Sequence, residues 1–264
     1  MNQRVRQIAV VTGASSGIGA ATAKALARDA WRVVLMARRA ERLEELVAEI
    51  STAGGEAMAE PLDAADGPAV MAMAERVLNE WGTPSLIVNS AGAGEWRFLE
   101  ETSVGEIVEM IGAPYLAAAN TCCAFMAEML EAERGLFVHV GSPASVMPWP
   151  GATAYTASRW ALRGLHEALC QDLRGTGVRS SLVYFGEVSS EYFEVNPGSH
   201  QYMPKLGSPI PVSTPEQCAE VLLKVVRRPR RVVFYPFPLR MMAWLAAITP
   251  GPTRWLAALT GRRH

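Results

Sequence analysis

The stretch Val10–Gly19 constrains the fold more than any other part of this 264-residue sequence. The apolar run Ile8–Val11 predicts a short buried strand, a glycine-rich turn follows at once, and Ala20–Arg28 predicts a helix. Glycines let the backbone turn tightly and approach a ligand closely. The helix N-terminus adds free N–H groups and a positive dipole end. The stretch therefore predicts a phosphate-binding turn in an α/β fold, with an ordinary strand–helix turn as the alternative.

Length, charge and cysteine content narrow the class of protein. The length is ample for one large α/β domain, and the net charge of −1 gives no electrostatic case for nucleic acid as a partner. The four cysteines show no metal-ligand or redox spacing. The first strand begins too early to leave room for a signal peptide, and no apolar run reaches the roughly 18–20 residues of a spanning helix. We therefore expect a cytoplasmic protein without a metal site.

Strands and helices alternate along the rest of the chain. Further buried strands are predicted at 31–36, 56–62, 85–88, 135–140, 178–184 and 232–235. This alternation predicts a doubly wound parallel sheet of about seven strands with helices on both faces. We expect one dinucleotide-binding catalytic domain over 1–264, with a substrate loop at 187–213. An apolar helical tail is expected at 236–264.

The end of the second predicted strand indicates which dinucleotide binds. NAD-binding folds usually carry an acidic residue here for the adenosine ribose, but this chain has Ala37 followed by Arg38 and Arg39. A guanidinium can bind a ribose 2′-phosphate through paired hydrogen bonds. The sequence therefore favours NADP(H) over NAD(H), with Arg38 as the main contact. A solvated basic turn before the next helix is the alternative.

Five separate segments occur in an order that resembles the short-chain dehydrogenase/reductase family. They are Gly13-x-x-x-Gly17-x-Gly19, Asn89-Ser90-Ala91-Gly92, Ser142 thirteen positions before Tyr155, Tyr155 with a cation four residues later at Arg159, and Gly186-x-Val188-x-Ser190. The resemblance covers the chain from about Ile8 to Tyr235. It implies a Rossmann fold and an NAD(P)-dependent oxidoreductase.

The resemblance also implies roles for individual residues. Tyr155 would be the general acid or base, and Ser142 would hydrogen-bond the substrate oxygen. Arg38 is the expected contact of the 2′-phosphate by the argument above. Asp63 is implied to bind the cofactor, with the cap of a helix over 64–81 as a second interpretation. The residues implied to bind the cofactor are Gly13, Ser15, Ser16, Gly17, Ile18, Gly19, Asp63, Asn89, Ala91, Gly92, Tyr155, Arg159, Gly186, Val188 and Ser190.

Two positions depart from the family pattern. Arg159 replaces the usual lysine, and Pro114, inside a helix predicted over 104–131, replaces the usual asparagine. A free tyrosine titrates at about pH 10, and a neighbouring cation favours its phenolate form. We therefore expect Tyr155 to be activated, but proton relay through position 159 to be lost, because arginine does not release its proton.

Two functions from different classes follow from these residues. The first is an NADP(H)-dependent carbonyl reductase or alcohol dehydrogenase acting on a lipophilic small molecule. It rests on Ser142 and Tyr155 at the family spacing. The second is a catalytically weak or silent NADP(H)-binding protein that acts as a sensor or interaction partner. It rests on Arg159 and Pro114.

Apolar residues outside these motifs bear on substrate and partners. Trp149 and Tyr192 lie in loops expected to roof the substrate pocket, where packing of the loop itself is the alternative. The tail predicts two short amphipathic helices separated by Pro250-Gly251-Pro252. Docking on the domain or a dimer face is favoured for it over a membrane surface. The resemblance implies a homodimer or homotetramer through the helices that carry Pro114 and Tyr155.

Overall fold

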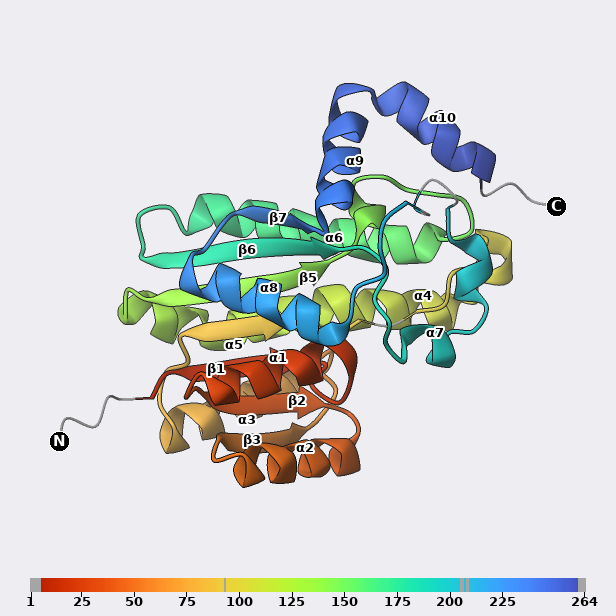
Figure 1. Cartoon of the computed structure of the whole chain (residues 1–264). Helices are drawn as coiled ribbons and strands as arrows, with labels where there is room; N and C mark the ends of the chain where they lie inside the picture. The colour runs from red at the N-terminus through yellow and green to blue at the C-terminus, as the bar shows by residue number, and fades with distance from the viewer. Residues whose placement is uncertain (1–5, 93, 205–206, 208, 261–264) are drawn as a thin grey trace.

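Seven strands form one parallel sheet in the computed structural model, which describes residues 6–92, 94–204, 207 and 209–260 (Figure 1). The strand order is β3-β2-β1-β4-β5-β6-β7. The strands are β1 (Ile8–Thr12), β2 (Arg32–Ala37), β3 (Glu56–Pro61), β4 (Leu86–Asn89), β5 (Gly135–Gly141), β6 (Val178–Phe185) and β7 (Val232–Tyr235). The predicted doubly wound sheet is confirmed, and each predicted strand end lies within one residue of the observed one.

Helices cover both faces of this sheet, and each face has its own core. One core joins the sheet to α1 (Gly17–Arg28), α2 (Ala40–Thr52) and α8 (Pro215–Arg227). The other joins it to α3 (Gly67–Glu80), α5 (Ala117–Glu131) and α6 (Thr153–Asp172). The central strands are buried on both sides, which is why their sequences are continuous apolar runs.

The chain reverses its direction of winding between β1 and β4. The two strands are hydrogen-bonded neighbours, with Thr12 beside Asn89. The Thr12 hydroxyl oxygen accepts hydrogen bonds from the backbone N–H groups of Ser90 and Ala91, both at 3.1 Å. These bonds hold the two carboxyl strand ends together at the switch point, where ligands bind in open α/β sheets.

The helix predicted over 104–131 is interrupted at Pro114. It consists of α4 (Val104–Ile111), a π-helical turn η2 (Gly112–Leu116) and α5. Pro114 lies in this π turn. Its missing N–H removes one regular helical hydrogen bond, which accounts for the interruption. Within the described chain, this is the one helical stretch long and apolar enough to cross a membrane, but half of its most apolar window is buried inside the fold.

Short elements complete the edge of the sheet that carries the site. They are η1 (Leu99–Glu101), η3 (Pro143–Ser145), α7 (Tyr192–Val195) and η4 (Ser199–Tyr202). The loop over 187–213 holds α7 and η4, and a bridge between Val188 and Ser213 closes its base. The two predicted tail helices are present as α9 (Phe237–Ile248) and α10 (Pro250–Thr260), which project from the body in Figure 1. Pro250-Gly251-Pro252 begins α10 instead of separating the helices, because proline is tolerated in the first turn of a helix.

Candidate active site

A cavity of about 1320 Å³ lies at the carboxyl edge of the sheet, beneath the loop over 187–213. It brings together almost all the residues that the sequence placed in the site. They are Gly13, Ser15, Ser16, Gly17, Ile18, Arg38, Asp63, Ala91, Gly92, Ser142, Trp149, Tyr155, Arg159, Gly186, Val188, Ser190 and Tyr192. Gly19 and Asn89 lie behind the wall, so any part they have in binding is indirect.

The glycine turn after β1 forms a cradle for a dinucleotide. Gly13 has a φ of 65°, and a Cβ there would approach the backbone of Ala91 to 2.9 Å. A Cβ at Gly19 would collide with the carbonyl oxygen of Gly13. Ser16 is the N-cap residue of α1 without a side-chain capping bond, so the first N–H groups of the helix remain available. The turn fits the pyrophosphate of a dinucleotide cofactor.

The two arginines after β2 have different surroundings. Arg39 donates to the Ser15 hydroxyl at 3.2 Å and pairs with Glu191 at 3.2 Å. Arg38 is exposed on the cavity wall and forms no hydrogen bond or ion pair within the described residues. The sequence did not reveal that Arg39 joins the glycine turn to the loop over the cavity.

The predicted capping role of Asp63 is wrong. Helix α3 begins at Gly67, and its cap is Asp66, whose carboxylate accepts from the Ala69 N–H at 3.1 Å. Asp63 instead accepts from the Ala65 N–H at 2.9 Å in the turn before the helix, while lining the cavity. Asp63 and Asp66 are both residues that favour a helix N-cap, so the sequence alone did not show which of them caps α3.

Tyr155 and Arg159 share one face of α6 inside the cavity. The guanidinium lies 5.0 Å from the centre of the Tyr155 ring, and the two residues are only 6 % and 7 % exposed. Arg159 donates to the Val140 carbonyl at 3.2 Å, but its buried Nε has no hydrogen-bond partner in the described part of the chain. It also forms no ion pair with a described carboxylate. A buried cation in this state favours negative charge beside it, such as a phenolate or an anionic ligand.

Ser142 stands at the end of β5 on the same cavity. It is the N-cap residue of η3, and its hydroxyl oxygen accepts from the Ala144 N–H at 3.3 Å. No described group accepts its proton, and no described group is hydrogen-bonded to the Tyr155 hydroxyl. Both hydroxyls can therefore serve a substrate oxygen.

An aromatic cluster lies beside Tyr155 in the cavity wall, and its centre, Trp96, was not predicted from the sequence. Trp96 is 4 % exposed, and its ring centroid lies 5.0 Å from Trp149, 5.4 Å from Tyr155 and 5.7 Å from Phe193. Its indole N–H donates to the Tyr192 hydroxyl at 3.0 Å, and burial raises the pKa of Tyr192. Trp96 follows a strand in a short polar loop without periodicity, so no pattern marked it.

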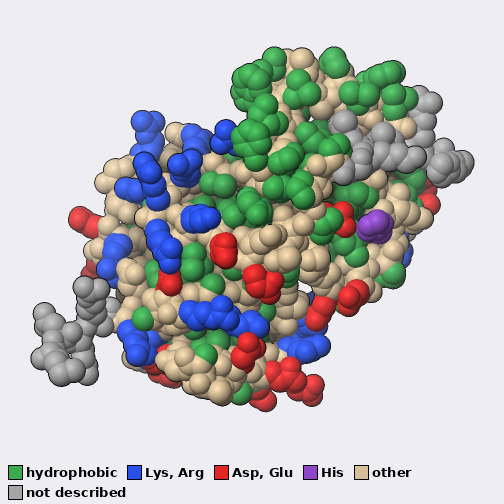
Figure 2. All heavy atoms as spheres, viewed as in Figure 1, with side chains coloured by type: hydrophobic (Ala, Val, Ile, Leu, Met, Phe, Trp, Pro, Cys, Tyr) green, Lys and Arg blue, Asp and Glu red, His purple; other side chains and the backbone are tan. Residues whose placement is uncertain are grey.

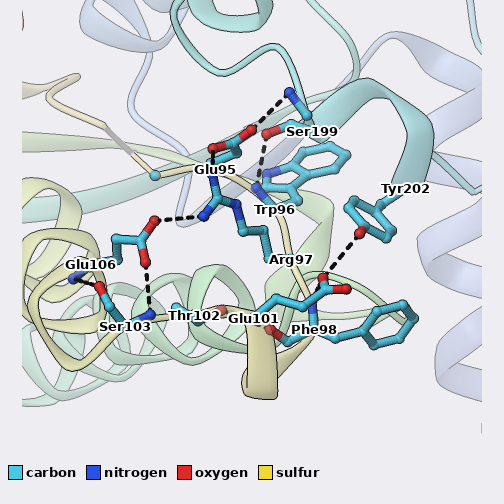
Figure 3. A network of polar contacts seen from close by, with 12 residues as sticks. Glu95, Trp96, Arg97, Phe98, Glu101, Thr102, Ser103, Glu106, Ser199 and Tyr202 are labelled. Atoms are coloured by element: carbon cyan, nitrogen blue, oxygen red, sulfur yellow. Dashed lines mark hydrogen bonds and ion pairs between the residues drawn. The ribbon is translucent and has the colours of Figure 1, made fainter.

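Polar contacts fasten the loop over 187–213 to the loop after β4 (Figure 3). The Gly198 N–H donates to Glu95 at 2.8 Å, and the Trp96 N–H donates to the Ser199 hydroxyl at 2.8 Å. The Tyr202 hydroxyl donates to Glu101 at 3.2 Å. These contacts join segments about a hundred residues apart and hold this loop in place beside the cavity.

Asn89 belongs to a buried polar network beneath the site. Its amide nitrogen lies 3.3 Å from Nδ1 of His139, and its oxygen accepts from the Thr121 hydroxyl at 2.7 Å. His139 is fully buried, and desolvation, assisted by nearby His166, lowers its pKa to about 3. The network holds β4, β5 and α5 together.

We expect His139 to make the fold sensitive to acid. The unfolded chain binds a proton at this residue below about pH 6.5, while the folded chain binds one only near pH 3. The contribution of neutral His139 to the free energy of unfolding is therefore fully present above about pH 6.5. It falls as the pH decreases, by at most about 1.4 kcal/mol per pH unit. Urea unfolding at about pH 7.5 and pH 5 should show that the free energy of unfolding decreases less between these pH values in His139→Leu than in the wild type. His200→Leu, at an exposed histidine, is the control, and an unchanged loss in His139→Leu would contradict the assignment.

Comparison with known proteins places these residues in context. A family model described as short chain dehydrogenase matches residues 7–197. An uncharacterized oxidoreductase of Myxococcus xanthus is 32% identical over 245 residues, which cover 92% of this chain and 93% of that protein. A glycine betaine reductase of Emericella nidulans is 29% identical over 228 residues, which cover 86% of this chain but only 18% of that protein.

Solved structures agree with this match. A metagenomic short-chain oxidoreductase in complex with NADP is 33% identical, with a TM-score of 0.74, and the match covers 86% of this chain and 96% of that one. An alcohol dehydrogenase from the archaeon Thermococcus sibiricus, complexed with 5-hydroxy-NADP, is 31% identical, with a TM-score of 0.75 and coverage of 87% and 94%. A Burkholderia phymatum protein in complex with NAD has a TM-score of 0.84 at 23% identity, with coverage of 96% and 97%, and this likeness concerns the fold alone.

Proposed function

The chain belongs to the short-chain dehydrogenase family of oxidoreductases, and from this premise we propose that it interconverts a carbonyl group and a secondary alcohol of a lipophilic small molecule with NADP(H). One observation carries the proposal. Among the described residues, none hydrogen-bonds the Tyr155 hydroxyl or accepts the Ser142 proton, and none is a counter-ion to the buried Arg159 beside them. All three line the same cavity as the glycine turn.

The roles of the three residues follow from their chemistry. When bound, the nicotinamide supplies the hydride to the carbonyl carbon. Ser142 donates a hydrogen bond to the carbonyl oxygen and positions it. Tyr155 donates its proton to that oxygen, which yields the alcohol and leaves a phenolate. Arg159 stabilises the phenolate through its charge, and because it keeps its own proton, Tyr155 must be reprotonated by another group or by solvent.

The choice of NADP(H) rests on Arg38. Its guanidinium has no protein partner within the described residues, whereas that of Arg39 is engaged by Ser15 and Glu191. An unengaged guanidinium at the cavity wall can form paired hydrogen bonds with a ribose 2′-phosphate. The similar metagenomic and archaeal structures bound to NADP and its 5-hydroxy derivative support this choice.

We expect Arg38→Ala to weaken NADPH binding about 10–100-fold, because charge-assisted hydrogen bonds to the 2′-phosphate are lost. NADH binding should change little, since NADH lacks that phosphate. Fluorescence titration of each variant with both dinucleotides measures the effect, with Arg42→Ala as the control on the following helix. Equal losses for NADPH and NADH, or stronger binding of NADH by the wild type, would refute the role of Arg38.

The aromatic and aliphatic lining supports a lipophilic substrate. Trp96 packs against both Tyr155 and Trp149, and Met203, Leu239 and Met242 extend the apolar wall. Apolar pockets with a few polar groups bind apolar ligands and orient them through those groups. Here the orienting groups are the hydroxyls of Ser142 and Tyr155.

A weak or silent NADP(H)-binding protein is the second candidate, favoured by Arg159 and Pro114. Arginine cannot relay protons, and Pro114 lacks the side-chain hydrogen bonds of an asparagine. Titration with NADPH followed by a panel of aldehydes and ketones separates the two candidates. Oxidation of NADPH on adding a carbonyl compound supports the enzyme. Tight binding without oxidation by any member supports the silent binder.

A further inference from the structure

The C-terminal helices present a group of large apolar side chains to the outside. Figure 2 shows this surface as a dense hydrophobic projection at the top of the molecule. Its exposed members are Phe237, Met241, Trp244, Leu245, Ile248, Trp255 and Leu256, which are 42–64 % exposed. Soluble proteins rarely leave so many apolar side chains together in water unless the surface binds something.

The described part of the chain leaves most of this surface uncovered. In α9 only Leu239 is buried, and in the described part of α10 only Thr253 and Ala257 are. Docking on the domain, one of the interpretations favoured from the sequence, therefore accounts only for the inner sides of the two helices. The outer side needs a different occupant.

Charge indicates what that occupant is. From Val232 to the end of the sequence there are four arginines and no lysine, aspartate or glutamate. Arg240 and Arg254 lie within the two helices and form no ion pair among the described residues, although Arg240 lies over the ring of Phe237 at 5.2 Å. An apolar surface with cations and without acids complements an anionic lipid surface.

A second copy of the chain fits this surface less well. In a two-fold dimer the same patch faces itself. Arg240 and Arg254 of one copy would then meet a patch that also carries arginines and lacks a carboxylate to pair with them. Such a contact places like charges together in an apolar interface.

The length of α9 and the exposed tryptophans of the tail indicate how these helices would contact a bilayer. Helix α9 has 12 residues, about 18 Å of helix, which is short of the hydrocarbon thickness of about 30 Å. The indoles of Trp244 and Trp255 are 64 % and 62 % exposed, and indoles favour the membrane–water interface. We propose that α9 and α10 lie in the plane of an anionic lipid bilayer and hold the protein on its surface.

The same helix reaches the cavity of the active site. Leu239 and Met242 of α9 line that cavity together with Tyr155. Docking through α9 therefore brings the cavity close to the bilayer, where a lipophilic substrate is concentrated. The proposed membrane contact does not depend on the proposed oxidoreductase activity. Only the route of a lipophilic substrate from the bilayer to the cavity rests on that activity.

Vesicle flotation of the purified full-length chain tests the proposal. We expect the chain to float with vesicles of phosphatidylcholine and phosphatidylserine, and less with phosphatidylcholine alone. Leu245→Glu should reduce binding at least about tenfold, and Arg240→Gln about fivefold. Met71→Glu, at a 47 % exposed position on α3, is the matched control and should bind as the wild type does. Thermal unfolding of each variant shows that the fold is kept.

Two results would overturn the proposal. One is the absence of flotation with anionic vesicles, and the other is flotation of Leu245→Glu at the wild-type level. Light scattering on the same samples identifies the competing occupant. A wild-type dimer that does not float, and that Leu245→Glu converts to a monomer, would show that a second copy covers the surface.

Discussion

Tyr155→Phe is expected to lower kcat/KM for carbonyl reduction by about 10²–10⁴-fold, while NADPH binding stays nearly unchanged. The substitution removes only the hydroxyl, which no described residue uses, and leaves the ring packed against Trp96. The fold and the cavity wall should therefore persist, and the loss should report proton donation. Steady-state rates, together with an NADPH titration of the same samples, measure the two quantities.

Tyr192→Phe provides the matched control at the same cavity. The Tyr192 hydroxyl donates to the Gly94 carbonyl at 2.6 Å and accepts from Trp96, so its loss loosens the roof instead of removing a proton donor. We expect a higher KM with kcat kept within about tenfold. If Tyr155→Phe retained full activity, or if Tyr192→Phe lost as much in kcat, Tyr155 would not be the general acid.

Gly19→Ala is expected to abolish detectable NADPH binding, a loss of at least about 100-fold. A methyl group at this position collides with the Gly13 carbonyl, and a neighbouring backbone is costly to move. The first turn of α1 must then shift away from the glycine turn, and the N–H groups lose their common direction. Thermal unfolding with and without NADPH shows both the stability of the variant and the loss of stabilisation by the ligand.

Gly164→Ala tests whether the loss of NADPH binding is specific to the glycine turn and not common to any added methyl group. Gly164 lies within α6, and a methyl group there meets no heavy atom within 4 Å in the described structure. We expect it to be neutral or to stabilise the fold by up to about 1 kcal/mol, with NADPH binding retained. A Gly19→Ala protein that is folded and still stabilised by NADPH would contradict the glycine-turn assignment.

The parts of the site encoded locally could be predicted from the sequence. The strand, turn and helix around Gly13 are contiguous, and the spacing of Tyr155 and Arg159 fixes them on one helical face. The family resemblance implied Ser142, and it lies at the same site because parallel strands place their carboxyl ends at one edge of the sheet. The interruption at Pro114 was also predictable, because proline removes a helical donor.

The parts that depend on contacts between distant segments could not be predicted. Trp96 acquires its role only because Trp149 and Phe193 are brought to it from other loops. Arg39 was overlooked because its partner Glu191 lies about 150 residues away. The exposure of Trp244 likewise depends on how α9 leaves the body, which a local amphipathic pattern does not fix.

Transfer of deuterium from the cofactor tests the central claim most directly. NADPH carrying deuterium at its reactive nicotinamide carbon is incubated with the purified protein and a panel of lipophilic aldehydes and ketones, and the products are analysed by mass spectrometry. The account predicts an alcohol that carries one deuterium on the former carbonyl carbon, formed by the wild type and nearly absent with Tyr155→Phe. Tight NADPH binding without deuterium in any product, across the whole panel, would contradict it and favour the silent binder.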